Sequence, residues 1–232
     1  MKVEIVRSVI GNYDDIIPIK KSKYNIKKLN ISSKKEASYY LDVCESKLQY
    51  SNQLISRYIK FSDFSSKADI KVWIDGNIYM ETLDQLIYNF AASDALVAVA
   101  KHPLRFSLKD ELKACLMGKK INMHEYKHIK SFLDLNDDNL KNLCQSGVML
   151  RKKSAKVDQT FIEIRVLLEK YAPRDQLFMM KIFNKHKIPV MLYNLDEYPI
   201  KITRHKTSFY KRLIKKLNYN FFKIVFKLKI IK

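Results

Sequence analysis

The chain has 232 residues, of which 47% are hydrophobic, a composition that suits one folded domain, or one domain with a tail, and excludes disorder. Its three cysteines form no C-x-x-C pair, which gives no support to a zinc knuckle or a disulfide framework and favours a reducing cytoplasm. The net charge is +20, and residues 201–232 hold 11 of the 44 Lys and Arg residues but none of the 24 Asp and Glu residues. Because no signal peptide and no membrane-spanning apolar run is visible, we expect a protein that is neither secreted by that route nor embedded in a bilayer.

Apolar strands and amphipathic helices alternate along the first 200 residues. Hydrophobic patterns predict strands over residues 3–10, 70–74, 95–100, 147–151 and 188–193. Helical spacing predicts helices over residues 34–50, 53–61, 82–92, 107–117, 123–133, 157–171 and 175–187. Residues 20–33 are basic and are expected to be irregular. Strands that alternate with helices predict an α/β fold with a mostly parallel sheet flanked by helices.

Polar side chains follow the ends of several predicted strands. They are Asp75, Asn77, His102 and Arg151. Because ligands of parallel sheets bind beyond the carboxyl ends of the strands, we expect these side chains to share one edge of the sheet.

The tripeptide Asp75-Gly76-Asn77 is the sharpest local motif. A carboxylate and an amide oxygen on either side of a glycine can offer two ligands to one hard cation, because glycine lets the backbone turn. Mn²⁺ and Mg²⁺ prefer such oxygen ligands and are commonly shared with substrate phosphates. The alternative is that these residues form only a turn.

Six short motifs occur in a distinctive order over residues 3–206. The motifs are residues 10–15, residues 56–60, residues 72–78, residues 101–105 with Glu111 and Cys115, residues 147–151 and residues 174–177. Together they resemble a glycosyltransferase-like domain family of bacterial polysaccharide gene clusters, which is also found in plant Golgi proteins of pectin and mucilage synthesis.

The resemblance implies a GT-A-like fold that uses a nucleotide-sugar donor. Asp75 and Asn77 would then stand in the metal motif, and His205 would complete the metal site. Arg57 and Lys60 would lie near the nucleotide or its phosphates. The pair Asp175-Gln176 is similar to an element that touches the donor sugar and the acceptor in retaining transferases of this fold, and we predict it to be catalytic.

Further candidates for binding the donor are His102, Arg105, Arg174 and Lys206. Structural alternatives stay open: Arg57 and Lys60 could form a solvated helix face, and His102 could only satisfy backbone groups. Arg105 could pair with Glu111, and Asp175 could only favour a helix N-terminus.

The chemistry requires stabilisation of the charge that develops on a leaving pyrophosphate. A divalent cation held by Asp75, Asn77 and His205, assisted by Arg57, Lys60 or Arg105, could provide it electrostatically. For Asp175, the residues alone leave three roles open: general base, nucleophile or positioning group.

Residues 201–232 form a basic amphipathic tail after a transferase domain over residues 1–200. A helical projection predicts one continuous apolar face with lysines and arginines at its sides and back. A basic helix with bulky apolar residues is typical of binding to anionic lipid, here through residues 207–232. The alternative is a helix packed on the domain with a solvated lysine face. The apolar face is formed by Tyr210, Leu213, Ile214, Leu217, Phe221, Ile224, Val225 and Leu228.

We therefore predict a metal-dependent glycosyltransferase that moves a sugar from a nucleotide donor to a saccharide or lipid-linked saccharide in cell-surface polysaccharide synthesis. It would be cytoplasmic and peripheral, on the inner face of the cell membrane. The chief alternative is a non-catalytic protein that retains the fold and binds membrane or polyanion. A hydrolase of a lipid amide ranks low because no Ser or Cys nucleophile with a nearby His is visible. We expect no nucleic-acid partner, because that would leave the apolar face of the tail unused.

Overall fold

The computed structural model describes residues 1–11, 22–41, 49–62, 67–105, 107–133, 143–203 and 209–227. Contacts divide the chain into two units. Unit 1 comprises Met1–Pro103 and Cys144–His205, and unit 2 comprises Leu104–Leu143 and Lys206–Lys232. The sequence predicted a boundary near residue 200 with a separate tail, whereas the contacts group the tail with residues 104–143.

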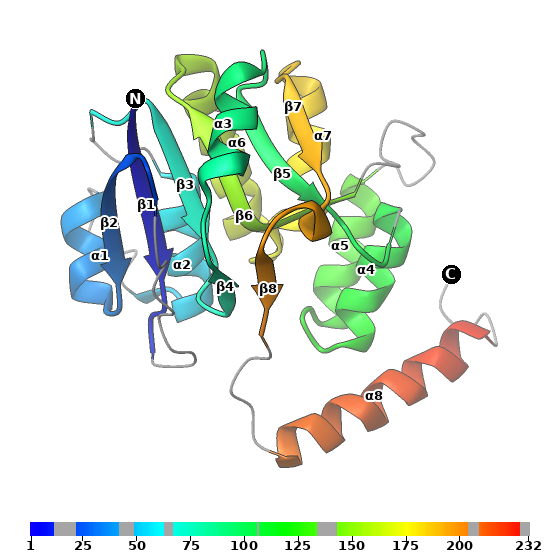
Figure 1. The fold of residues 1–232 in the computed structure, drawn as a ribbon. Helices are drawn as coiled ribbons and strands as arrows, with labels where there is room; N and C mark the ends of the chain where they lie inside the picture. The colour runs from blue at the N-terminus through cyan, green and yellow to red at the C-terminus, as the bar shows by residue number, and fades with distance from the viewer. Residues whose placement is uncertain are drawn as a thin grey trace. The chain divides into compact units, whose positions relative to one another are not determined.

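Unit 1 is built on a six-stranded sheet with the order β2-β1-β3-β6-β5-β7 (Figure 1). The pairs β1–β2, β1–β3 and β5–β7 are parallel, and β6 runs antiparallel to both of its neighbours. The predicted α/β class with a mostly parallel sheet is therefore confirmed. The strands are β1 (Lys2–Ser8), β2 (Asn25–Ile31), β3 (Ile70–Ile74), β5 (Val97–Lys101), β6 (Cys144–Lys152) and β7 (Val190–Tyr193).

The direction of β6 corrects one prediction about the edge of the sheet. Arg151 pairs in register with Lys71 and Val97, near the starts of β3 and β5. It therefore lies at the end of the sheet opposite Asp75 and His102, and the expectation that it shares their edge is wrong. Arg151 is buried, donates a hydrogen bond to the Ser62 carbonyl and covers the ring of Phe161 in helix α6 (Ala155–Lys170).

Strand β2 corrects a second prediction, because residues 20–33 were expected to be irregular. Asn25–Ile31 pairs along its whole length with β1 and forms one edge of the sheet. Only Leu29 and Ile31 are buried in this strand, while Lys27 and Lys28 are exposed. Lysines are common on edge strands, where they discourage pairing with other chains, and here they obscured the alternation that marks a strand.

The helices of unit 1 lie on both faces of the sheet. Helix α2 (Asn52–Phe61) contacts α1 (Lys34–Leu41) and α6 (Ala155–Lys170), and α6 contacts α7 (Met179–Lys185). Helix α3 (Asp84–Ala92) packs in a cluster with Ile70, Val72 and Ile74 of β3. Since side chains alternate along a strand, Trp73 faces the other side, and Lys60 of α2 lies 5.7 Å from its ring centroid.

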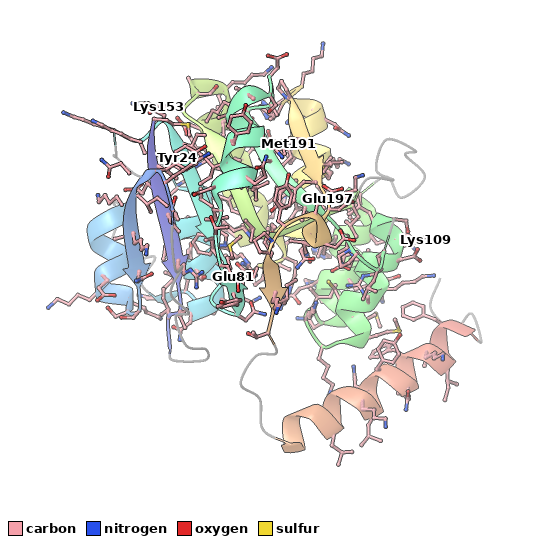
Figure 2. The ribbon with its side chains drawn as sticks, in the orientation of Figure 1. Tyr24, Glu81, Lys109, Lys153, Met191 and Glu197 are labelled. Atoms are coloured by element: carbon pink, nitrogen blue, oxygen red, sulfur yellow. The ribbon has the colours of Figure 1, made fainter. Side chains whose placement is uncertain are left out.

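Two short strands form a second, antiparallel sheet: β4 (Ile78–Met80) pairs with β8 (Ile200–Ile202). The 3-10 helices η3 (Asp175–Leu177) and η4 (Leu195–Glu197) complete the described elements of unit 1. Tyr24 and Met191 pack partly buried against its core (Figure 2).

Unit 2 consists of α4 (Leu108–Met117), α5 (Met123–Phe132) and the predicted C-terminal helix α8 (Phe209–Lys227). Helix α5 begins with a capping box, in which Asn122 and Glu125 each accept the other's backbone N–H. Helix α8 contacts α4, where the Asn218 amide donates to the Met117 carbonyl at 2.7 Å. In the part of the chain that the structure describes, no helix combines the length and apolar character needed to cross a membrane.

Candidate active site

Helix α2 presents two cations on one face. The Ser51 hydroxyl caps the helix by accepting the Leu54 N–H at 3.2 Å. Arg57 and Lys60 follow three residues apart, a spacing that places them on the same side of a helix. The Lys60 side chain is 0% exposed and that of Arg57 is 17% exposed. They are therefore not a solvated lysine and arginine face.

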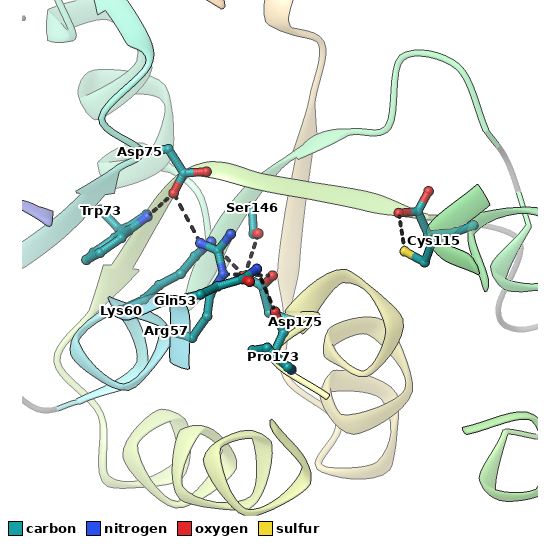
Figure 3. Close-up of polar contacts among 10 residues, drawn as sticks. Gln53, Arg57, Lys60, Trp73, Asp75, Cys115, Ser146, Pro173 and Asp175 are labelled. Atoms are coloured by element: carbon teal, nitrogen blue, oxygen red, sulfur yellow. Dashed lines mark hydrogen bonds and ion pairs between the residues drawn. The ribbon is translucent and has the colours of Figure 1, made fainter. Parts of the chain in front are cut away.

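The innermost partner of these cations is Asp175, which lies in η3 and is buried. Lys60 Nζ lies 2.7 Å from Asp175 Oδ2, and the Ser146 hydroxyl donates to the same oxygen at 2.7 Å (Figure 3). Arg57 Nε lies 3.6 Å from the other oxygen, Oδ1. Asp175 is thus more than the start of a helix, because both of its oxygens face cations.

The outermost member is Asp75, directly after β3. Its Oδ1 accepts hydrogen bonds from Trp73 Nε1 at 2.7 Å and from Arg57 Nη1 at 3.3 Å. Its backbone N–H donates to the Gly147 carbonyl at 2.7 Å, which fixes the strand end against β6. Arg57 therefore lies between two carboxylates. We call Arg57, Lys60, Asp75 and Asp175 the ion cluster.

Exposure increases along the ion cluster. The side chains of Lys60 and Asp175 are 0% and 4% exposed, whereas those of Arg57 and Asp75 are 17% and 26% exposed. The inner pair is therefore shielded, and the outer pair can be reached by a ligand. A buried charge pair is compatible with folding only when each charge is well compensated.

Burial alone would raise the pKa of Asp175, but the charges of Arg57 and Lys60, with hydrogen bonds from Lys60 and Ser146, hold that pKa well below its ordinary value. Burial also lowers the pKa of Lys60, although the charges of Asp175 and Asp75 oppose this shift. Asp175 is consequently an anion at neutral pH, and its negative charge is directed at the two cations of α2.

Asn77 joins the candidate site to strand β8. Its side-chain N–H donates to the Thr203 carbonyl at 2.9 Å, and the N–H and hydroxyl of Thr203 both donate to the Asn77 carbonyl at 2.8 Å. These bonds fix the amide so that Oδ1 is its remaining acceptor.

The oxygen atoms of this corner fit a divalent cation that is shared with a ligand. Asp75 Oδ2 and Asn77 Oδ1 have no hydrogen-bond partner among the described residues. Across those residues, no three His, Cys, Asp or Glu side chains converge to form a closed metal site. The protein would therefore supply two oxygens, and phosphates or further residues would supply the rest, as is common for Mg²⁺.

The other predicted residues of unit 1 lie near these strand ends or beside Asp175. His102 follows β5 and is 8% exposed. Arg174 and Gln176 flank Asp175 and are half-buried. The Gln53 amide of α2 lies 3.4 Å from the Pro173 carbonyl, so α2 also touches the segment that leads into η3.

Of the other predicted donor-binding residues, Arg105 has a charged partner that is not part of the ion cluster. Arg105 lies in unit 2 and forms an ion pair with the buried Glu111, whose other oxygen accepts a hydrogen bond from Cys115. This is the structural pairing that the sequence left open. His205 and Lys206 lie outside the described residues.

Sequence reasoning missed four residues that shape the site: Trp73, Ser146, Gly147 and Thr203. The indole N–H of Trp73 donates to Asp75 Oδ1 and so positions that carboxylate. A Cβ added at Gly147 would come within 2.7 Å of Ile78, which explains why the smallest residue stands there. The antiparallel direction of β6 brings Ser146 and Gly147 to the site, and no pattern in the sequence marks that direction.

No protein-family model matches the chain, and a search of curated proteins finds no match. Among solved structures, mouse xyloside xylosyltransferase 1 is similar over 83% of this chain and 85% of that chain, with 10% identity and a TM-score of 0.45. The bifunctional glycosyltransferase WbbM matches 93% of this chain, with 18% identity and a TM-score of 0.47, and this chain spans 44% of that protein. Glucosyl-3-phosphoglycerate synthase from Mycobacterium tuberculosis, solved with Mn²⁺ and UDP, matches 91% of this chain and 74% of that chain, with 11% identity and a TM-score of 0.43. At such identities and scores, what this chain does has to follow from its own residues.

Removal of one partner from the inner pair should destabilise the fold strongly. We expect Lys60→Met to lower the free energy of unfolding by about 3–5 kcal/mol, because it leaves Asp175 as a poorly compensated buried charge. The double variant Lys60→Met/Asp175→Asn should lose less than the two single variants together. Denaturant unfolding measures all three, with Lys185→Met as a control from an exposed ion pair that is worth less than about 1 kcal/mol. Additive losses would show that Lys60 and Asp175 do not interact.

The lowered pKa of Asp175 also predicts how stability depends on pH. A carboxylate whose pKa is depressed on folding stabilises the protein above its unfolded pKa, about 3.9, and loses that contribution as pH falls toward the folded value. The difference in unfolding free energy between the natural protein and Asp175→Asn should therefore narrow as pH drops below about 4. A difference that stays constant from neutral pH to acid would contradict an ionised, paired Asp175.

Proposed function

We propose that the chain is a glycosyltransferase that transfers a sugar from a nucleotide-sugar donor. The observation that supports this most is the placement of Asp75 and Asn77 at the carboxyl end of β3, with Arg57 beside them. Two free oxygens for a hard cation, next to a partly exposed guanidinium, match the needs of a diphosphate. Ligands of α/β sheets bind at such strand ends.

The diphosphate would bind at the outer part of the ion cluster. A cation held by Asp75 Oδ2 and Asn77 Oδ1, Mn²⁺ or Mg²⁺, would supply charge stabilisation of the leaving pyrophosphate. Arg57 would contribute to the same task by turning from Asp75 toward a phosphate oxygen, since a guanidinium binds phosphate with two parallel N–H groups. His205 is proposed as a third ligand; it follows Thr203, which is bonded to Asn77.

Among the three roles left open for Asp175, the geometry favours positioning. A nucleophile or base needs an accessible lone pair, whereas Asp175 is 4% exposed, with Lys60 and Ser146 both on Oδ2. We propose that Asp175 anchors Lys60 and orients Arg57. Gln176, which is half-buried beside it, would contact the donor sugar or the acceptor.

Four further residues are proposed to contact the nucleotide-sugar donor. His102 and Arg174 would bind the donor from the strand end of β5 and from the residue before η3. Lys206 would do so after β8. Arg105, whose charge is paired with Glu111, would have to exchange that partner for the donor in order to bind it.

We also propose that the acceptor is a saccharide or lipid-linked saccharide of cell-surface polysaccharide synthesis. The enzyme would work in the cytoplasm as a peripheral protein on the inner face of the cell membrane. Residues 207–232 would contact anionic lipid, because the C-terminal 32 residues carry basic side chains and no acidic ones. No nucleic acid is involved in this function.

A nucleoside diphosphate with Mn²⁺ should stabilise the protein against thermal unfolding. A ligand at about 100 times its dissociation constant contributes about 2.7 kcal/mol, which shifts the melting temperature by several degrees. The shift should require the nucleoside diphosphate and Mn²⁺ together. It should be lost in Asp75→Asn, because that substitution removes the negative charge of the side chain that is proposed to bind the metal. Turnover of a panel of nucleotide sugars should be lost in the same variant.

Asp69→Asn is the matched control, because Asp69 lies directly before β3 and Asp75 lies directly after it. The Asp69 carboxylate is exposed and accepts a hydrogen bond from the Lys2 N–H. This variant should keep the full thermal shift. A natural protein that responds to no nucleotide with metal would favour the alternative function, a fold retained for binding membrane or polyanion. An unchanged response in Asp75→Asn would exclude Asp75 as a ligand.

A further inference from the structure

Helix α8 exposes a row of large apolar side chains on one side. Leu213, Leu217, Phe221 and Ile224 are 44%, 62%, 60% and 58% exposed. At about 100° per residue, these four positions fall within an arc of about 80°, so they form a continuous line along the helix. We call them the apolar stripe.

A different side of α8 packs inside unit 2. Asn218 donates a hydrogen bond to the Met117 carbonyl of α4, and Val225 is 9% exposed. The ring centroids of Phe226 and of Tyr126 in α5 lie 6.1 Å apart. Together with Phe222, which lines a cavity of about 390 Å³ next to the α4–α5 turn, these residues form the packed face.

The structure therefore divides the single apolar face that the sequence predicted. Val225 belongs to the packed face, and so do Phe222 and Phe226, which were not part of the prediction. The apolar stripe lies on another side. The side chains of Tyr210 and Ile214, and residue Leu228, fall outside the part of the chain that the structure describes.

The charges around the apolar stripe indicate which partner it fits. Lys216 and Lys223 are exposed and lie on one flank of the stripe, about 60° and 80° around the helix from Leu213. Residues 201–232 contain no acidic side chain that could offset them. Apolar side chains bordered by lysines suit the boundary between acyl chains and anionic headgroups, whereas a second copy of this helix would bring like charges together.

We infer that the apolar stripe inserts into the surface of an anionic bilayer while the packed face stays on α4 and α5. This inference rests on the membrane association proposed above and adds which side of α8 meets lipid. Membrane binding then requires no release of the helix from unit 2. A helix of this composition lies in the interface and does not span it.

Two neighbouring tryptophan variants of the full chain test the orientation. Trp73 is the only native tryptophan and is 4% exposed, so bromine in the lipid should quench its fluorescence little. With vesicles of brominated phosphatidylcholine and phosphatidylglycerol, Phe221→Trp fluorescence should be quenched strongly, whereas Phe222→Trp should be quenched little. Equal quenching, or stronger quenching of Phe222→Trp, would overturn the assignment of the two faces.

Binding to the same vesicles without bromine tests the partner. Leu217→Ser/Phe221→Ser should weaken partitioning by about ten-fold or more, because two large apolar side chains no longer enter lipid. Ile162→Ser/Val166→Ser is the matched control, since these side chains of α6 are 52% and 53% exposed and also four residues apart. That control should bind like the natural protein.

The contribution of charge to vesicle binding is tested with the double variant Lys216→Ala/Lys223→Ala. Its control is Lys109→Ala/Lys127→Ala, which removes two exposed lysines from α4 and α5 of the same unit (Lys109 is labelled in Figure 2). Only the first pair should weaken binding, and vesicles of pure phosphatidylcholine should bind the natural protein poorly. Absence of vesicle binding, or dimers in sedimentation that Leu217→Ser/Phe221→Ser abolishes, would overturn the inference. The thermal shift caused by nucleotide and metal is measured without lipid. A protein that does not bind vesicles can therefore still show that shift, so the membrane inference and the proposed transferase function can fail independently.

Discussion

The candidate site depends on the ion pair between Lys60 and Asp175, which lies almost fully out of water. Its cost in lost hydration is offset only because Ser146 and Arg57 also approach the carboxylate. Arg57 is thereby held between Asp175 and Asp75. A guanidinium held in this way is oriented before any ligand arrives, and orientation in advance is what electrostatic stabilisation of a leaving group requires.

Much of this site could be predicted from single residues, but not from their arrangement. Arg57, Lys60, Asp75 and Asp175 stand in short motifs, and the helical spacing of the first two already placed them on one face. Their mutual pairing could not be predicted, because residues more than a hundred positions apart meet only through the sheet order. Ser146 shows the limit most clearly: it reaches Asp175 because β6 is antiparallel, and an apolar strand has the same pattern in either direction.

The same distinction applies to the fold and to the tail. Long apolar strands and amphipathic helices were predicted where they occur, whereas the edge strand β2, with its exposed lysines, was not. For α8, periodicity predicted a helix with apolar residues at the correct spacing. Which apolar side chains turn inward could not be predicted, since that depends on contacts with α4 and α5.

The most direct test of the central claim is a crystal structure with a nucleoside diphosphate and Mn²⁺, in which anomalous scattering locates the metal. The account predicts Mn²⁺ bound by Asp75 Oδ2 and Asn77 Oδ1 and bridging the two phosphates, with Arg57 turned toward a phosphate oxygen and Lys60 still paired with Asp175. A diphosphate bound elsewhere on the protein, with Asp75 still held by Arg57 and Trp73 and free of metal, would contradict it.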